Sequence, residues 1–311
     1  MDKKYCFCCG KEIKEGLWHE KCIKSFFGTS SIPEISIKEE DIKKLAITQL
    51  EKSSTIAGVQ EKLSLHLDLE QKRRPRLTII GFPSGYILKP QTEEHYHLPE
   101  FEHTAMLMAE ECGLSVVPHA LIEINEDKEL AYITKRIDRN GSNKIHMEDF
   151  AQATLTTTEN KYRSSYEECM NLIDKFSHNP ALDKVNLFRC LYFCFVIGNS
   201  DVHLKNFSFI MDNDGKLRLS KFYDLLPTKI IMPDDHEELG MRFNGKKKML
   251  FKQDFYTFAS NTGIDNKVAD NIIKYINNKK DAMIDIINKS NLNQIEKNSW
   301  IKLISSNIKR P

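Results

Sequence analysis

The chain has 311 residues, of which 41% are hydrophobic and 29% charged, and its 45 Lys and Arg nearly balance its 44 Asp and Glu. This length is enough to bury a sizeable core in one large domain or two lobes, and the balanced charge gives no reason to expect direct binding to DNA or a membrane surface. We find neither a signal peptide nor an apolar run long enough to span a bilayer, so we expect a cytoplasmic protein.

The chain begins with a cysteine-rich segment. Two residues separate Cys6 from Cys9, and two separate His19 from Cys22. Three thiolates and an imidazole at such spacings are typical of a tetrahedral, structural Zn2+ site. Cys8 offers an alternative ligand, and a reduced segment that is packed or partly disordered and binds no metal is the competing interpretation.

The next part of the chain predicts a helix followed by a small sheet. Residues 37–50 have a helical pattern, and strands then alternate with Gly and Pro breaks. A helix at residues 99–111 has apolar side chains at helical spacing, a Pro in its first turn and a Gly after its end. The five predicted strands are residues 64–69, 76–80, 86–88, 120–124 and 129–134.

From residue 166 onward the pattern is mainly helical. Helices are predicted at residues 166–176 and 185–198, and the second is apolar nearly all round, as a helix in a core is. Strands at residues 207–211 and 217–219 flank an Asp-Asn-Asp-Gly turn. A mixed lobe followed by a helical one predicts an α+β fold with a cleft between the lobes, where ligands tend to bind.

The strongest chemical signal lies where the buried helix ends. Phosphoryl transfer from ATP needs a carboxylate that orients the attacking hydroxyl, an amide oxygen that holds a metal ion and a second carboxylate that bridges metal and phosphates. Asp201, Asn206 and Asp224 supply these groups in that order. The Asp-x4-Asn spacing matches a protein-kinase catalytic loop, although such a spacing without its context is more often a solvated turn.

Two upstream features fit the same chemistry. Lys89 ends a short apolar strand, from which its ammonium group can reach ATP phosphates, and Glu102 on the next helix is its predicted ion-pair partner. Glu100 is the competing partner, and a solvated lysine is the competing interpretation. Residues 53–62 are a candidate phosphate-binding loop, with Lys62 as a second phosphate contact, or else an ordinary Ser/Thr-rich turn.

Together these residues resemble the HipA-like kinases of bacterial toxin–antitoxin systems. The motifs that carry the resemblance are residues 56–62, 87–90, the Glu102 helix, and residues 134–139, 145–153, 201–206 and 222–224. The resemblance implies a two-lobed, protein-kinase-like fold. A small β-rich N-lobe would comprise residues 51–140 and a larger helical C-lobe residues 141–311, after a cysteine-containing segment and linker helix in residues 1–50.

The resemblance also implies roles for single residues. Asp201 would be the catalytic aspartate of an ATP-dependent serine/threonine kinase, and Asn206 and Asp224 would bind Mg2+. Lys89 would hold the phosphates, and Lys135 departs from the acidic residue expected at its position, so that only a backbone contact is implied there. The other implied nucleotide contacts are Glu102, Ile56, Ala57, Gly58, Lys62, Thr134, Ile137 and His203.

In the HipA-like family a Ser or Thr of the phosphate loop is autophosphorylated, and the modified loop leaves the nucleotide site. A dianionic group there would compete with the ATP phosphates and pair with Arg or Lys elsewhere. The candidate residues for this switch are Ser53, Ser54 and Thr55.

Within the family, the chain resembles most the short HipT toxins of three-component HipBST systems, since the shared core begins near residue 50. The implied partners are a small HipS-like antitoxin and a HipB-like DNA-binding protein, with DNA reached only through the complex and no membrane. The implied substrate is an aminoacyl-tRNA synthetase, the tryptophanyl enzyme first and the glutamyl enzyme second, whose modification would inhibit translation. A kinase-like small-molecule phosphotransferase and a non-catalytic binding module stay open as alternatives.

Overall fold

The structure is a computed structural model that describes residues 4–35, 62–69, 74–78, 84–124, 127–141 and 143–310. The predicted linker helix and residues 53–61 of the predicted phosphate loop lie outside these ranges. The chain divides into two compact units. The first comprises residues 1–103, 117–144 and 289–291, and the second comprises residues 104–116, 145–288 and 292–311.

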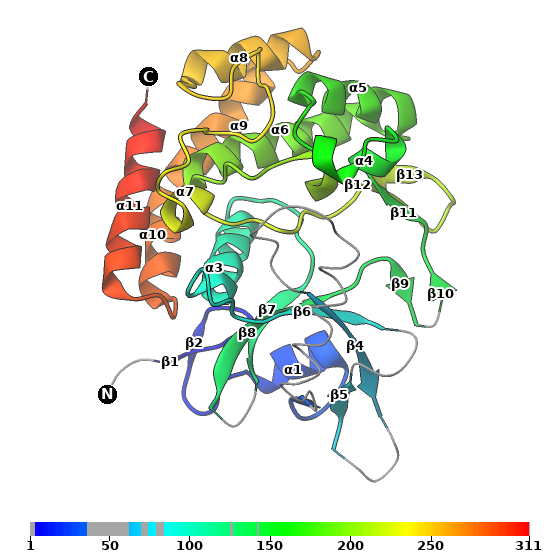
Figure 1. Ribbon diagram of the computed structural model, residues 1–311, viewed down its shortest axis with the longest axis vertical. Coiled ribbons are helices and arrows are strands. Elements are labelled where there is room, and N and C mark those ends of the chain that lie inside the picture. Colours follow the sequence, from blue (N-terminus) through cyan, green and yellow to red (C-terminus); the bar gives the residue numbers. More distant parts are fainter. Residues whose placement is uncertain are drawn as a thin grey trace. The chain divides into compact units, whose positions relative to one another are not determined.

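The first unit is built on a six-stranded sheet with strand order β3-β5-β4-β6-β8-β7 (Figure 1). Its strands are β3 (Glu34–Ile35), β4 (Leu63–Asp68), β5 (Arg76–Thr78), β6 (Tyr86–Lys89), β7 (His119–Ile124) and β8 (Glu129–Lys135). Buried side chains such as Leu65 and Leu88 alternate with more exposed ones in β4 and β6, as in a strand with one face on a core. Strand β8 lies between β6 and β7 in the sheet, and its residues 131–134 are all buried. The five predicted strands are confirmed where the structure describes them.

A small N-terminal element that the sequence did not predict packs on this sheet. Strands β1 (Lys4–Tyr5) and β2 (Glu12–Ile13) pair with each other. Helix α1 (Glu20–Phe27) ends at Gly28, which has a φ of 76°, a conformation that glycine adopts without strain. The backbone N–H of Leu121 donates to the carbonyl of Phe7 over 2.9 Å. The first unit also holds the β9–β10 hairpin (Arg139–Asn140 and Asn143–Lys144) and the start of α3 (Leu98–Glu111).

The second unit is mainly helical and is centred on α6 (Pro180–Ile197), whose second half is almost entirely buried. Helix α6 begins five residues before its predicted start. Asn179 accepts a hydrogen bond from the N–H of Leu182, and Pro180 occupies the first turn, so the helix has both a cap and a favourable first residue. The other helices are α4 (Phe150–Ala153), α5 (Tyr166–Phe176), α7 (Thr228–Ile231), α8 (Lys252–Asn261), α9 (Asn266–Asn278), α10 (Lys280–Lys289) and α11 (Gln294–Lys309).

A three-stranded sheet in the second unit positions the segment that follows α6. Its order is β11 (Met147–Asp149), β12 (Ser208–Met211) and β13 (Leu217–Leu219), and the predicted Asp-Gly hairpin joins the last two strands. Asp183 of α6 is buried and accepts a hydrogen bond from the backbone N–H of Leu219 over 2.9 Å. This contact fixes the hairpin against the central helix.

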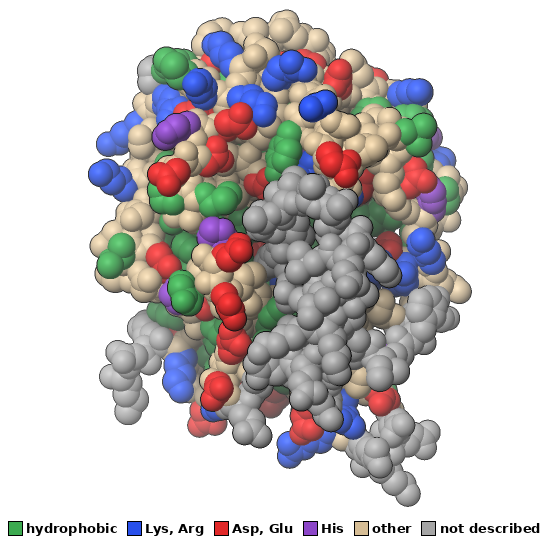
Figure 2. Space-filling view, in the orientation of Figure 1, with side chains coloured by type: hydrophobic (Ala, Val, Ile, Leu, Met, Phe, Trp, Pro, Cys, Tyr) green, Lys and Arg blue, Asp and Glu red, His purple; other side chains and the backbone are tan. Residues whose placement is uncertain are grey.

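The surface carries both signs of charge, as the composition predicts. Lys and Arg side chains and Asp and Glu side chains both occur over much of the face drawn in Figure 2. Within the part of the chain that the structure describes, no helix combines the length and the apolar character needed to cross a bilayer.

Candidate active site

The predicted catalytic loop begins where α6 ends. Gly198 has a φ of 80° and caps the helix by donating its N–H to the carbonyl of Cys194. The chain then turns through Asp201 into a short 3-10 helix (Leu204–Asn206) and enters β12. A buried helix and a paired strand therefore hold the two ends of a short polar loop.

The structure brings two predicted metal ligands together. The side-chain amide of Asn206 donates to Oδ2 of Asp224 over 2.7 Å, and its Oδ1 atom accepts from the N–H of His203 over 2.9 Å. An amide oxygen has two lone pairs, so Oδ1 keeps one for a metal ion. Asp224 has a φ of 61°, in the left-handed region, which is uncommon for residues other than glycine but which Asp adopts more readily than most.

Asp201 lies in a largely buried position and contacts a residue that the sequence did not point to. Burial raises the pKa of the Asp201 carboxyl, and the negative charge of Asp224 acts in the same direction. The hydroxyl of Tyr162 opposes this effect, because it donates a hydrogen bond to Oδ1 of Asp201. Tyr162 is 39 residues away in sequence, and no local motif marks it.

We expect Tyr162→Phe to raise the pKa of Asp201 further, since the variant loses a hydrogen bond that stabilises the carboxylate. A proton acceptor must be ionised, so the acid limb of the kcat/KM profile should move to higher pH. Tyr256→Phe is the matched control, because Tyr256 donates a similar hydrogen bond to Asp270 on the surface. An acid limb that stays in place in Tyr162→Phe, or moves to lower pH, contradicts this role of Tyr162.

His203 is the other titratable group of the loop. Burial lowers the pKa of its imidazole to about 4, so the ring is neutral at physiological pH. Its Nδ1 atom is buried and has no hydrogen-bond partner among the residues that the structure describes. The ring of Tyr162 packs edge-on against it with 5.0 Å between the centroids. A neutral imidazole with a buried nitrogen to satisfy is suited to a ligand contact.

Gly240 lies in close contact with the backbone of the predicted catalytic loop. A Cβ atom at this position would lie 2.7 Å from the carbonyl oxygen of Val202 and 2.8 Å from that of Ser200. Any larger residue must therefore displace the backbone on both sides of Asp201. No spacing in the sequence reveals this requirement, because it depends on the approach of two distant segments.

We expect Gly240→Ala to lower the rate of the chemical step by about tenfold to a hundredfold, since displacements of about 1 Å have effects of this size. Single-turnover kinetics measures that step. Gly85→Ala is the control, because an added Cβ there meets nothing within 4 Å. Equal rates for Gly240→Ala and the wild type would show that the loop tolerates the displacement.

The predicted ion pair in the first unit is present. The ammonium group of Lys89, at the end of β6, lies 2.8 Å and 2.9 Å from the two carboxylate oxygens of Glu102 on α3. The side chain of Lys89 is 13% exposed and that of Glu102 only 1%. Lys89 also lies 5.5 Å from the centroid of the Tyr132 ring. This lysine is thus held in one place rather than solvated.

The other predicted nucleotide contacts that the structure describes lie in or next to strands β4 and β8. Thr134 is buried in β8, between β6 and β7, and its hydroxyl donates to the carbonyl of Pro118. The N–H of Lys135 donates to the same carbonyl, and its side chain is exposed. Ile137 follows the end of the strand and is half-buried, and Lys62 is exposed beside β4. The candidate residues Ser53, Ser54, Thr55, Ile56, Ala57 and Gly58 lie outside the described residues.

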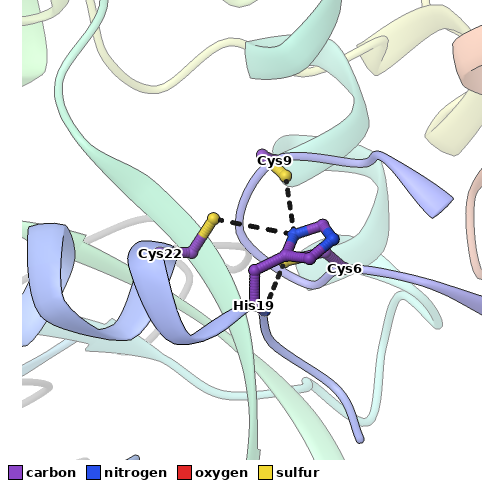
Figure 3. Close-up of side chains that lie close together, drawn as sticks. All are labelled: Cys6, Cys9, His19 and Cys22. Carbon is purple, nitrogen blue, oxygen red and sulfur yellow. Dashed lines mark hydrogen bonds between the residues drawn. The ribbon is translucent and has the colours of Figure 1, made fainter. Parts of the chain in front are cut away.

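A second cluster lies in the N-terminal element. The potential ligand atoms of Cys6, Cys9, His19 and Cys22 all lie within 4.8 Å of one another. Figure 3 shows the imidazole of His19 directed toward the sulfur atoms of Cys9 and Cys22. Cys8, the alternative ligand, does not belong to this group.

Comparison with known proteins shows which family the chain resembles. The model of the HipA-like C-terminal domain family matches residues 54–284. A putative kinase of Haemophilus influenzae is 26% identical over 78% of this chain and 77% of its own length. The putative kinase Y4mE of Sinorhizobium fredii is 32% identical over 68% of this chain and 51% of its own length. The serine/threonine-protein kinase toxin HipA of Shewanella oneidensis is 26% identical over 59% of this chain and 45% of its own length.

Two solved structures share the mixed α/β fold. HipA in a complex of Shewanella oneidensis HipA, HipB and operator DNA superposes with a TM-score of 0.67 at 20% identity, over 88% of this chain and 69% of that one. The proinflammatory kinase CtkA of Helicobacter pylori superposes with a TM-score of 0.54 at 16% identity, over 74% and 89%. At such identities the likeness concerns the fold.

Proposed function

Because the chain belongs to the HipA-like C-terminal domain family, we propose that it is a two-lobed serine/threonine protein kinase that uses ATP and Mg2+. One observation carries the proposal: the side chain of Asn206 meets that of Asp224, and in the same loop the partly buried carboxyl of Asp201 is hydrogen-bonded to a hydroxyl. A kinase needs this combination of a metal-binding pair and a proton acceptor for an alcohol.

The residues fit a magnesium ion. Mg2+ prefers oxygen ligands and is usually held by one or two carboxylates together with substrate phosphates, and Asp224 and Asn206 offer a carboxylate and an amide oxygen. When bound, the ion would neutralise charge on the phosphates. In this proposal Lys89 would contribute a positive charge to the ATP phosphates, and Glu102 keeps its ammonium group in position.

Asp201 performs the proton transfer in this proposal. The hydroxyl oxygen of a substrate Ser or Thr forms a bond to the γ-phosphorus, the bond from that phosphorus to the bridging oxygen breaks, and ADP leaves. The proton of the hydroxyl passes to the carboxylate of Asp201. Tyr162 donates to Oδ1 of that carboxylate in the structure, and an ionised carboxylate has further acceptor sites for a second hydroxyl.

We further propose that the kinase is a toxin whose target is an aminoacyl-tRNA synthetase, with the tryptophanyl enzyme favoured over the glutamyl enzyme. A HipB-like protein is the proposed DNA-binding partner, and the complex that HipA forms with HipB and operator DNA supports it. The proposed neutralising partner is a HipS-like protein, in accordance with the resemblance to HipT. Autophosphorylation at Ser53, Ser54 or Thr55 would regulate nucleotide binding.

Incubation of the purified chain with labelled ATP and a bacterial lysate tests the proposal. Label in a discrete protein band, absent with Asp201→Ala, supports a protein kinase, and phosphoproteomics of induced cells then identifies the target. Label found only in small metabolites contradicts it in favour of a small-molecule phosphotransferase. Phosphate that persists on residues 53–55 of the Asp201→Ala chain contradicts autophosphorylation.

A further inference from the structure

We propose that Cys6, Cys9, His19 and Cys22 bind one structural zinc ion, which holds the N-terminal element against the sheet of the first unit. The ligand atoms of these residues form a compact group (Figure 3). This inference does not depend on the kinase activity, since it concerns only residues 4–35 and the strands they contact.

The spacing of the atoms agrees with tetrahedral coordination. Zinc binds cysteine sulfur at about 2.3 Å and histidine nitrogen at about 2.0–2.1 Å, so a sulfur and a nitrogen of one tetrahedral site lie about 3.6 Å apart. Nδ1 of His19 is 3.4 Å from the sulfur of Cys9 and 3.9 Å from that of Cys22. These two separations are close to the one that a shared ion requires, and all four ligand atoms lie within 4.8 Å of one another.

Contacts around the ligands fix their orientation. Nε2 of His19 lies 3.1 Å from the carbonyl oxygen of Glu12, which can only accept a hydrogen bond, so Nε2 carries the proton and Nδ1 presents its lone pair to the sulfur atoms. A backbone carbonyl behind a histidine ligand is a common arrangement in zinc sites. The backbone N–H of His19 also donates to the sulfur of Cys6 over 3.4 Å.

The alternatives fit these side chains less well. All eight cysteines are free thiols in the structure, so no disulfide links this cluster. Three protein sulfurs and one nitrogen complete a four-coordinate shell, whereas catalytic zinc sites keep one position open for water or substrate. A structural ion is therefore the class of ligand that this site selects.

A zinc ion at this site would stabilise the N-terminal element. Strands β1 and β2 have two residues each, which is too short for independent stability. Next to the cluster, Trp18 packs on Phe26 and Phe27, and both phenylalanines contact the ring of Tyr86 on β6. Strand β6 ends in Lys89. An ion at His19 and Cys22 would therefore stabilise the aromatic contacts that Phe26 and Phe27 make with the strand that carries this lysine.

Metal analysis of the full chain tests the site. We expect about one zinc per chain, a strongly reduced content in Cys9→Ser and an unchanged content in Cys8→Ser. Cobalt(II) added to the metal-free chain should give the absorption bands of a tetrahedral thiolate site in the wild type and in Cys8→Ser. A wild-type chain that holds no zinc and gives no such cobalt spectrum would refute the proposal, as would a Cys8→Ser variant that alone loses the metal.

Tryptophan fluorescence tests the structural role without any kinase assay. The chain has two tryptophans, and Trp18 lies beside the site, whereas Trp300 is fully buried in the second unit. Chelation of zinc should shift the emission to the red as Trp18 becomes exposed, and added zinc should reverse the shift. Trp18→Phe is the control and should show no shift. Unchanged emission in the wild type after complete removal of zinc would contradict the structural role.

Discussion

Replacing Asp201 by asparagine should lower the rate of phosphoryl transfer by about 10²–10⁴-fold, the usual contribution of a positioned proton acceptor. Asparagine has nearly the same shape as aspartate, and its carbonyl oxygen can still accept the hydrogen bond from Tyr162. The amide, however, cannot take a proton from a substrate hydroxyl. We therefore expect a normal melting temperature and normal ATP binding together with a slow chemical step, measured in single turnover at saturating ATP.

Asp214→Asn is the matched control for this experiment. Asp214 lies in the exposed turn between β12 and β13 of the same unit, so the variant makes the same change of charge away from the loop. Its rate should equal that of the wild type. If Asp201→Asn also keeps the wild-type rate, Asp201 is not the proton acceptor. A lower melting temperature of Asp201→Asn would indicate a structural role for Asp201.

The sequence predicted the elements whose signals are local. Residues 64–69 alternate as a half-buried strand does, and the nearly all-apolar helix α6 is typical of a protein core. The pairing of Lys89 with Glu102 rather than Glu100 also followed from one helix face turned toward the sheet. In each case the pattern spans a few residues, and burial of one face decides the structure.

What the sequence could not predict depends on contacts between distant segments. Tyr162 precedes Asp201 by 39 residues, and Gly240 follows it in a different loop, so no spacing rule connects them to the catalytic loop. The cysteine-rich, turn-rich pattern before residue 28 did not predict helix α1, although Gly28 is a typical helix stop.

Replacing Lys89 by methionine should affect both stability and activity, and a second substitution separates the two effects. Loss of the ammonium group leaves the buried carboxylate of Glu102 without the partner that lies 2.8 Å away. Breaking a buried ion pair in this way costs about 3–5 kcal/mol of folding free energy. Urea unfolding should therefore show a large destabilisation of Lys89→Met.

The double variant Lys89→Met/Glu102→Leu removes both charges and should recover most of that stability, because an apolar pair of similar volume avoids the cost of a buried charge that has lost its ion-pair partner Lys89. Its affinity for ATP should nevertheless stay about 10–100-fold below that of the wild type, since a hydrogen bond to a charged group contributes about 1.5–3 kcal/mol. If the stable double variant binds ATP as tightly as the wild type, Lys89 has only a structural role. If the double variant is stable but binds ATP more weakly, the ammonium group of Lys89 contacts the phosphates. Loss of folding stability cannot explain the weaker binding in that case, because the double variant has recovered its stability.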